Sequence, residues 1–256
     1  MNNDLKDLFY KLNEIILPRI NPILDYISTY NKIVNLVENI KDIDESIESF
    51  KTTCALLGYP PHYSLFITKN QLSLLFKDFQ GNEDEVKQII DNFYMARFND
   101  VYIKEKFLKR WEQTTILSKR LKIIKESISC FEQELYFTAI PVLFSQLEGM
   151  VADGYNHKGR MSGKQLKQYI LDLFNAERDS SFETQLSQFY TNIILVGFEH
   201  SETIDSFLSR HAIMHGGDVE YGTKQNYIKL LLFFDFVYEK IIEKQRECEE
   251  LAENER

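Results

Sequence analysis

Apolar residues recur at intervals of three and four along most of this chain, the spacing that gathers them on one face of an α-helix. Leu5, Leu8 and Leu12 show this spacing near the start of the chain, and Ile124 and Ile128 show it near the middle. Ten glycines and five prolines are few interruptions for 256 residues. The sequence therefore predicts an all-α fold, with a helical bundle in the C-terminal part and a helical N-terminal region.

Residues 1–105 form the N-terminal region in this interpretation, with a role in packing, dimerisation or recognition. Pro60 and Pro61 cannot continue a helix, so a tight connection is predicted there, with His62 on the surface of the loop. No motif in this region carries a recognisable chemistry. Its predicted helices cover residues 3–17, 22–40, 42–57, 68–79 and 83–98.

Residues 106–256 form the predicted bundle. Its first helix is expected to begin slightly earlier, at residue 100. We expect Trp111 in the core, and we expect Pro141 to bend or divide the helix that contains it. Ser162 and Thr223 are the candidate caps of two further helices. The predicted helices cover residues 100–132 (as one helix or two in succession), 135–154, 163–174, 180–196, 199–215 and 224 onward.

The chain carries a formal net charge of −9 at pH 7, which disfavours loose, sequence-independent binding to nucleic acid. An RNA partner would then need a local basic patch. A candidate lies in residues 106–125, where a single acid, Glu112, stands among seven basic residues. These form either such a patch or a solvated helix face; they are Lys106, Lys109, Arg110, Lys119, Arg120, Lys122 and Lys125.

No apolar run approaches the ~20 residues that a membrane span needs, and the first ten residues carry alternating charge rather than an apolar signal segment. Cys54, Cys130 and Cys248 are an odd number without paired spacing, which argues against a disulfide framework or a cysteine metal site. We therefore expect a cytoplasmic protein that does not bind a membrane.

The strongest chemical signal lies between Ile204 and Tyr221, where Arg210, His211 and His215 fall within six positions. An arginine offers a planar fork of donors that stays charged and matches phosphate oxygens. A histidine accepts or releases a proton near neutral pH. Cleavage of an RNA phosphodiester needs both kinds of group.

Two other interpretations of this cluster stay open. The spacing predicts a helix that starts at Glu199 and ends at Gly216, so basic side chains near its C-terminus would complement the helix dipole. Alternatively, His211 and His215, four residues apart, would form half of a zinc site, but the glutamate of the metalloprotease motif is missing. We expect neither a metal nor another cofactor.

Glu148 stands out because its carboxylate lies in an apolar segment, where burial without a partner is costly. Either Arg210 or a motif histidine is its partner, or Glu148 is an exposed helix residue. Basic residues in the loop before the helix predicted over 163–174, and at the start of that helix, form either a substrate-binding rim or a solvated surface. Tyr221 is a further candidate, which either offers its hydroxyl to the substrate or packs against neighbouring residues. The basic residues are Lys158, Arg160 and Lys164.

Arg210-x-x-x-x-His215, with the polar His211 directly after the arginine, resembles the Arg-x(4–6)-His signature of HEPN domains. The segments Leu135–Met150 and Arg210–Phe236 are similar to one HEPN-like group of defence-associated proteins. The resemblance covers about the last 150 residues.

This resemblance implies a metal-independent endoribonuclease in antiviral defence or in a toxin system, with RNA as substrate and a regulatory protein as a possible partner. His215 would act as general base or acid and Arg210 would stabilise the phosphoryl charge, while His211 and Glu148 would orient these groups. The 2′-hydroxyl attack would leave a 2′,3′-cyclic phosphate. The resemblance also implies a homodimer with a composite active site. The alternative is a non-catalytic HEPN-like interaction or nucleotide-binding module.

Overall fold

The computed structural model describes residues 58–60, 62, 88, 91, 92, 94–174, 187, 189–200, 203, 204 and 206–254. The secondary-structure elements among these residues are all helices, with no β-strand, which confirms the predicted all-α class. The helices predicted over 3–17, 22–40, 42–57 and 68–79 lie outside them. The described residues of the helix predicted over 83–98 are helical at positions 88, 91, 92 and 94–97.

The chain divides into two compact units, Met1–Phe50 with Phe66–Ala96 and Lys51–Leu65 with Arg97–Arg256. Every contact described below lies within the second unit. The boundary near residue 105 stays a prediction.

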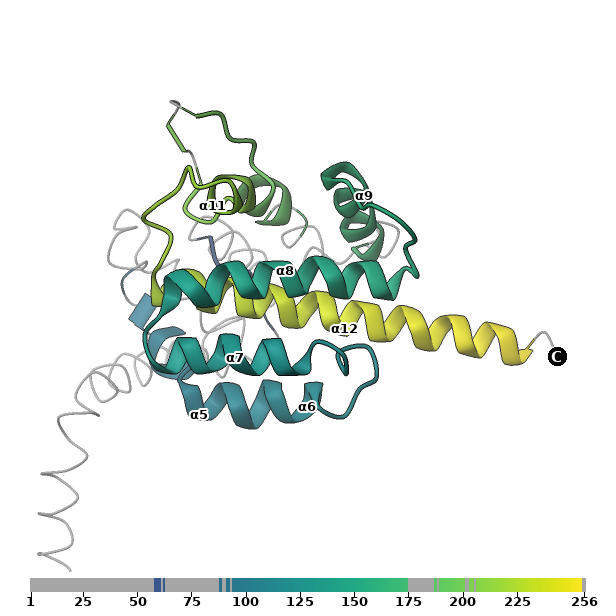
Figure 1. The fold of residues 1–256 in the computed structure, drawn as a ribbon. Coiled ribbons are helices and arrows are strands. Elements are labelled where there is room, and N and C mark those ends of the chain that lie inside the picture. The colour runs from purple at the N-terminus through teal and green to yellow at the C-terminus, as the bar shows by residue number, and fades with distance from the viewer. Residues whose placement is uncertain are drawn as a thin grey trace, which may run out of the picture. The chain divides into compact units, whose positions relative to one another are not determined.

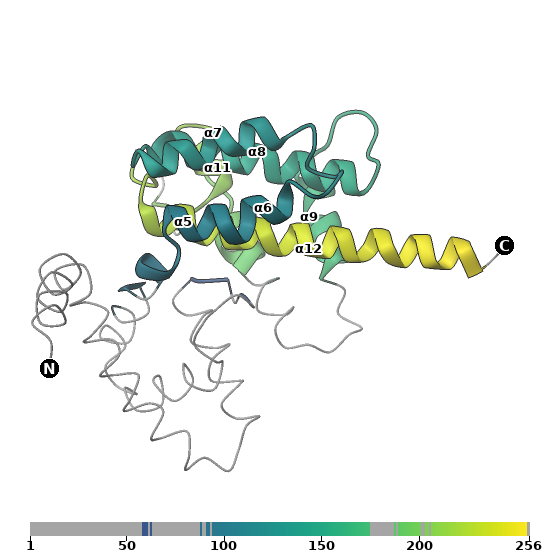
Figure 2. The same ribbon diagram turned by 90° about the horizontal axis from the view of Figure 1, so that it is seen from below.

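The second unit is built around the apolar helix α8, Tyr136–Gly154, which packs against α7 and α12 (Figures 1 and 2). The shorter helices α9 and α11 also pack on α8. The segment predicted as one or two helices over 100–132 is two, separated by residues 112–120. The other bounds are α5 Asp100–Tyr102, η1 Ile103–Leu108, α6 Lys109–Trp111, α7 Leu121–Glu132, α9 Gly163–Leu173, η2 Tyr190–Ile194, α11 Arg210–Met214 and α12 Lys224–Asn254.

The core lies along α12, whose residues 226–238 are all buried. Trp111 is fully buried, as predicted, and its ring meets Phe234 and Tyr238 of α12 edge-on at 5.1 and 6.4 Å between centroids. Aromatic contacts of this kind join α6 to α12. Among the described residues, each helix is too short or too polar to cross a lipid bilayer.

The predicted caps form. Ser162 accepts from the backbone N–H of Gln165 at 3.2 Å, and the Gln165 side chain accepts from the Ser162 N–H in return, a complete capping box. Thr223 Oγ1 accepts from the backbone N–H of Asn226 at 3.1 Å. These contacts fix the starts of α9 and α12.

The predicted division of the helix at Pro141 does not occur, because α8 continues through it from Tyr136 to Gly154. Proline has no N–H to donate to the carbonyl of Phe137, four residues earlier. The Tyr221 hydroxyl donates to that carbonyl instead, at 2.9 Å. A side chain from a distant segment thus satisfies the group that Pro141 leaves without its helical partner.

The prediction that His62 lies on the surface is wrong. His62 is 1% exposed, and its Nε2 donates to Asp235 Oδ2 at 2.9 Å. Asp235, fully buried in α12, also accepts from Trp111 Nε1 at 2.8 Å and from the Arg110 guanidinium. His62 is buried because it brings a hydrogen-bond donor to the carboxylate of Asp235, which would be costly to bury without a partner.

The basic residues between 106 and 125 do not form a free patch. Most are paired with acids, which favours the alternative of a solvated helix face for those residues. The pairs are Lys109 with Glu105, Arg110 with Asp235 and Glu239, Lys119 and Arg120 with Asp153, and Lys125 with Glu112.

Candidate functional site

The motif lies on a single short turn of helix. The predicted helix from Glu199 to His215 is wrong, since the helix spans Arg210–Met214 and the described residues between 199 and 209 are irregular. Ser206 and Ser209 explain the difference, because their hydroxyls bond to backbone groups and so compete with a helix. Ser206 Oγ donates to the Ile193 carbonyl at 2.6 Å and accepts from Leu208 N–H at 3.1 Å.

Ser209 starts the motif helix. Its hydroxyl accepts from the Ala212 N–H at 3.2 Å and donates to the Val196 carbonyl at 3.1 Å. Arg210 is therefore the first residue of α11, where the positive end of the helix dipole lies, so the dipole does not explain its presence. Gly216, at a φ of +74°, follows the C-cap residue His215, as the sequence predicts.

Glu148 of α8 is the partner of Arg210. The Nε–H of Arg210 donates to Glu148 Oε1, and the two side chains are 20% and 24% exposed. The predicted pairing is confirmed, and the alternative of an exposed, unpaired Glu148 is wrong. The terminal nitrogens of the guanidinium make no hydrogen bond to another described residue, so their N–H groups are available to an anion.

The two motif imidazoles lie close together. The ring centroids of His211 and His215 are 6.0 Å apart, and the ring planes differ by 15°. His215 is exposed and His211 is half-buried. Burial, then the charge of Arg210, then His215 lower the pKa of His211 below the usual value of a histidine, against a weaker opposing effect of Glu148. The neutral imidazole is therefore the main form of His211 at neutral pH.

The start of α9 approaches this pair. A Cβ at Gly163 would lie 3.9 Å from His211 Nε2. Lys164, next in the chain, is exposed, as are Lys158 and Arg160 in the preceding loop. Lys158 lines a separate pocket at the end of α8, so the predicted basic rim does not converge on one point.

Tyr221 occupies a structural position. Besides its bond to the Phe137 carbonyl, its ring meets the Phe137 ring edge-on at 5.2 Å. These contacts favour the packing alternative over a contact with substrate.

Sequence reasoning missed Tyr190. This residue lies in η2, is 1% exposed and stacks on Phe233 at 5.3 Å between centroids. Its hydroxyl has no hydrogen-bond partner among the described residues. Burial and then the charge of Glu148 raise its pKa, while Arg210 opposes the rise, so the hydroxyl lies within the field of the ion pair. No sequence signal separates such a tyrosine from an ordinary core aromatic residue.

A metal site is not assembled from the described part of the chain, in which no three His, Cys, Asp or Glu side chains come together. Cys130 is half-buried and Cys248 is exposed, and both are free thiols. His211 and His215 therefore have no third ligand of these types among the described residues.

Comparison of the chain with protein-family models, with curated proteins and with solved structures gives no match. The resemblance to HEPN domains thus stays a prediction from the motif and the two segments that carry it.

Proposed function

We propose that this chain is a metal-independent endoribonuclease of the HEPN type, with Arg210, His211, His215 and Glu148 at its active site. The observation that carries the proposal is the arrangement of α11. One turn of helix presents a guanidinium, held at Nε by Glu148, beside two imidazoles 6.0 Å apart. A charged donor fork and two proton-transfer groups are the parts that phosphodiester cleavage without a metal requires.

In the proposed reaction the 2′-oxygen of the RNA forms a bond to the adjacent phosphorus, and the bond from phosphorus to the 5′-oxygen breaks. His211 takes the proton of the 2′-hydroxyl, because a lowered pKa keeps its imidazole neutral. His215 donates a proton to the leaving 5′-oxygen. Arg210 stabilises the charge on the phosphoryl oxygens. The products are a 2′,3′-cyclic phosphate and a 5′-hydroxyl.

This assignment gives each proton transfer its own histidine within one chain. It replaces the sequence-based hypothesis that His215 alone exchanges protons and His211 orients. The homodimer that the resemblance implies would bring two such turns to one cleft. We keep the homodimer as part of the proposal, with RNA as its substrate.

Incubation of the purified protein with mixed RNA in excess EDTA tests the proposal. We expect the parent to cleave and to leave cyclic-phosphate ends, and Arg210→Ala and His215→Ala of equal purity to leave the RNA intact. Equal cleavage by all three would identify a contaminating nuclease. Loss of the parent's activity in EDTA would contradict a metal-independent reaction.

The alternative is a non-catalytic interaction or nucleotide-binding module. The net charge of −9 and the pairing of most basic residues between 106 and 125 favour it. RNA binding without cleavage by the parent protein would support this alternative over the nuclease.

The biological role in the proposal is antiviral defence or a toxin system, with cytoplasmic RNA as target and a regulatory protein as partner. Induced expression in a host cell tests it. We expect the parent to arrest growth and His215→Ala to be tolerated, whereas equal growth of both strains would count against a toxic nuclease.

A further inference from the structure

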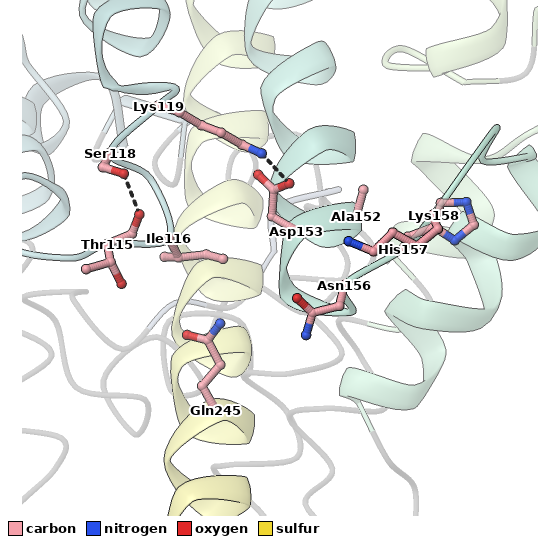
Figure 3. Close-up of a pocket in the computed structure, with 10 residues that line it drawn as sticks. All are labelled: Thr115, Ile116, Ser118, Lys119, Ala152, Asp153, Asn156, His157, Lys158 and Gln245. Atoms are coloured by element: carbon pink, nitrogen blue, oxygen red, sulfur yellow. Dashed lines mark hydrogen bonds and ion pairs between the residues drawn. The ribbon is translucent and has the colours of Figure 1, made fainter.

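A polar pocket of about 400 Å³ lies at the C-terminal end of α8 (Figure 3). Three segments line it: the connection between α6 and α7, the end of α8 with the loop that follows, and Gln245 of α12. Its volume lies within the range of roughly 300 to 1,000 Å³ that is usual for small-ligand sites. The pocket is thus large enough for one sugar–phosphate unit.

The charges around this pocket favour an anion. Lys119 Nζ lies 2.6 Å from Asp153 Oδ1, and Arg120 donates to Asp153 Oδ2 from Nε and from a terminal nitrogen at 3.0 and 2.8 Å. Two cations therefore already neutralise the carboxylate on the pocket wall. Lys158, also on the wall, is exposed and makes no hydrogen bond or ion pair with the described residues. The surroundings keep an excess of positive charge.

The other lining groups suit a sugar and a phosphate better than a nucleobase. The amides of Asn156 and Gln245 and the hydroxyl of Thr115 offer hydrogen bonds. Among the described lining residues there is no Phe, Tyr or Trp on which a base would stack, and the His157 ring points away from the other labelled side chains (Figure 3). Asn156 adopts a φ of +48°, a conformation that asparagine tolerates and that ends the helix there.

We infer that this pocket binds a ribose–phosphate unit of an RNA strand at a position away from the cleaved bond. The inference rests on the proposed function in taking RNA as the ligand. The chain itself connects the two places, because five residues after Lys158 the start of α9 reaches His211, with Gly163 beside its Nε2. A strand held by Lys158 thus lies at one end of a loop whose other end adjoins the motif.

The test measures binding of full-length protein to a fluorescent 2′-O-methyl RNA, which lacks the attacking hydroxyl and so cannot be cleaved. We expect Lys158→Glu to weaken binding about tenfold and to reduce the slope of log affinity against log salt by at least the ~0.7 expected for one lost contact to a single strand. Asn156→Gly keeps the backbone conformation and should weaken binding by a smaller factor. Lys104→Glu, an equal charge change at an exposed residue outside both the pocket and the basic segment 106–125, is the matched control.

Equal losses for Lys158→Glu and Lys104→Glu would overturn the inference, since net charge alone would then explain them. Ribose 5-phosphate and AMP test whether the ligand is RNA or a free sugar phosphate. If either compound binds in a way that depends on Lys158, and RNA does not compete with it, the inference is also overturned. If RNA binding depends on Lys158 but the parent protein cleaves no RNA in EDTA, the pocket inference stands and the nuclease proposal fails.

Discussion

Two of the arginine–carboxylate pairs in the second unit lie in different surroundings. Asp235 is fully buried and accepts from His62, Trp111 and Arg110. Glu148 and Arg210 are each about one-fifth to one-quarter exposed, and the Tyr190 hydroxyl, which has no hydrogen-bond partner among the described residues, lies in their field. Donors from several segments surround the first carboxylate, as structural stability requires. The second pair retains donor capacity and solvent access, which a site for an anionic substrate requires.

Replacing Arg210 gives the largest expected effect. Arg210→Ala should lower the cleavage rate about a thousandfold, because the charge on the phosphoryl oxygens loses its stabilising donors. The unfolding free energy should fall by about 1–3 kcal/mol, since Glu148 loses its partner but stays partly exposed to water. Cleavage rates and urea unfolding check both parts, with exposed Arg246→Ala as control. If Arg210→Ala destabilised the protein enough to explain its loss of activity, the distinction between the Arg210–Glu148 pair and the Arg110–Asp235 pair would disappear.

Replacing Asp235 gives the opposite pattern. Asp235→Ala should lower the unfolding free energy by about 3–5 kcal/mol, because it removes the acceptor of the buried His62 and Trp111 side chains and one of the two carboxylates that pair with Arg110. The exposed Glu243, paired with Lys240, offers the control Glu243→Ala, which should cost little. Thermal and urea unfolding measure the difference. A small effect at Asp235 would show that the buried network is not what stabilises this unit.

The pH dependence of stability sharpens this contrast. Burial alone would raise the pKa of Asp235, but the hydrogen bond and charge of His62 and the charge of Arg110 outweigh it and lower the pKa. Because the folded pKa is below the unfolded one, this stabilisation is present above the unfolded pKa of ~3.9 and is lost as the pH falls through the folded pKa. Urea unfolding between about pH 6 and 2 should show this loss in the parent, below pH ~4, and less of it in Asp235→Ala. Parallel curves would contradict it.

Two tyrosines should respond oppositely to loss of the hydroxyl. Tyr221→Phe should lower the unfolding free energy by about 1 kcal/mol, because the Phe137 carbonyl loses its donor. Tyr190→Phe should raise it by up to about 1 kcal/mol, because the hydroxyl is buried without a partner among the residues that the structure describes. Thermal unfolding of both variants checks the signs. Destabilisation by Tyr190→Phe would mean that its hydroxyl is satisfied in solution.

The sequence predicts much of the described fold, because helix formation here follows local signals. The apolar spacing, Ser162 and Thr223 mark helices that the structure contains. The start of the motif helix was not predictable in this way. Ser206 and Ser209 bond to carbonyls of residues 193 and 196, thirteen positions earlier, and apolar spacing carries no information about such bonds.

The candidate site was predicted in part. A carboxylate in an apolar segment required a partner, which led to the pairing of Glu148 with Arg210 across 62 positions. His62 gave no such indication, since its acceptor lies 173 positions later. The pocket at the end of α8 combines three distant segments and has no motif of its own.

Cleavage of an RNA whose scissile 5′-oxygen is replaced by sulfur tests the central claim, that His211 and His215 divide the two proton transfers. A thiolate leaves without needing a proton, so the general acid becomes dispensable. On ordinary RNA, His211→Ala and His215→Ala should each lose about a hundredfold or more in rate. On the sulfur-substituted RNA, His215→Ala should recover most of the parental rate while His211→Ala stays slow. Recovery by both variants, or by neither, would contradict this division of roles.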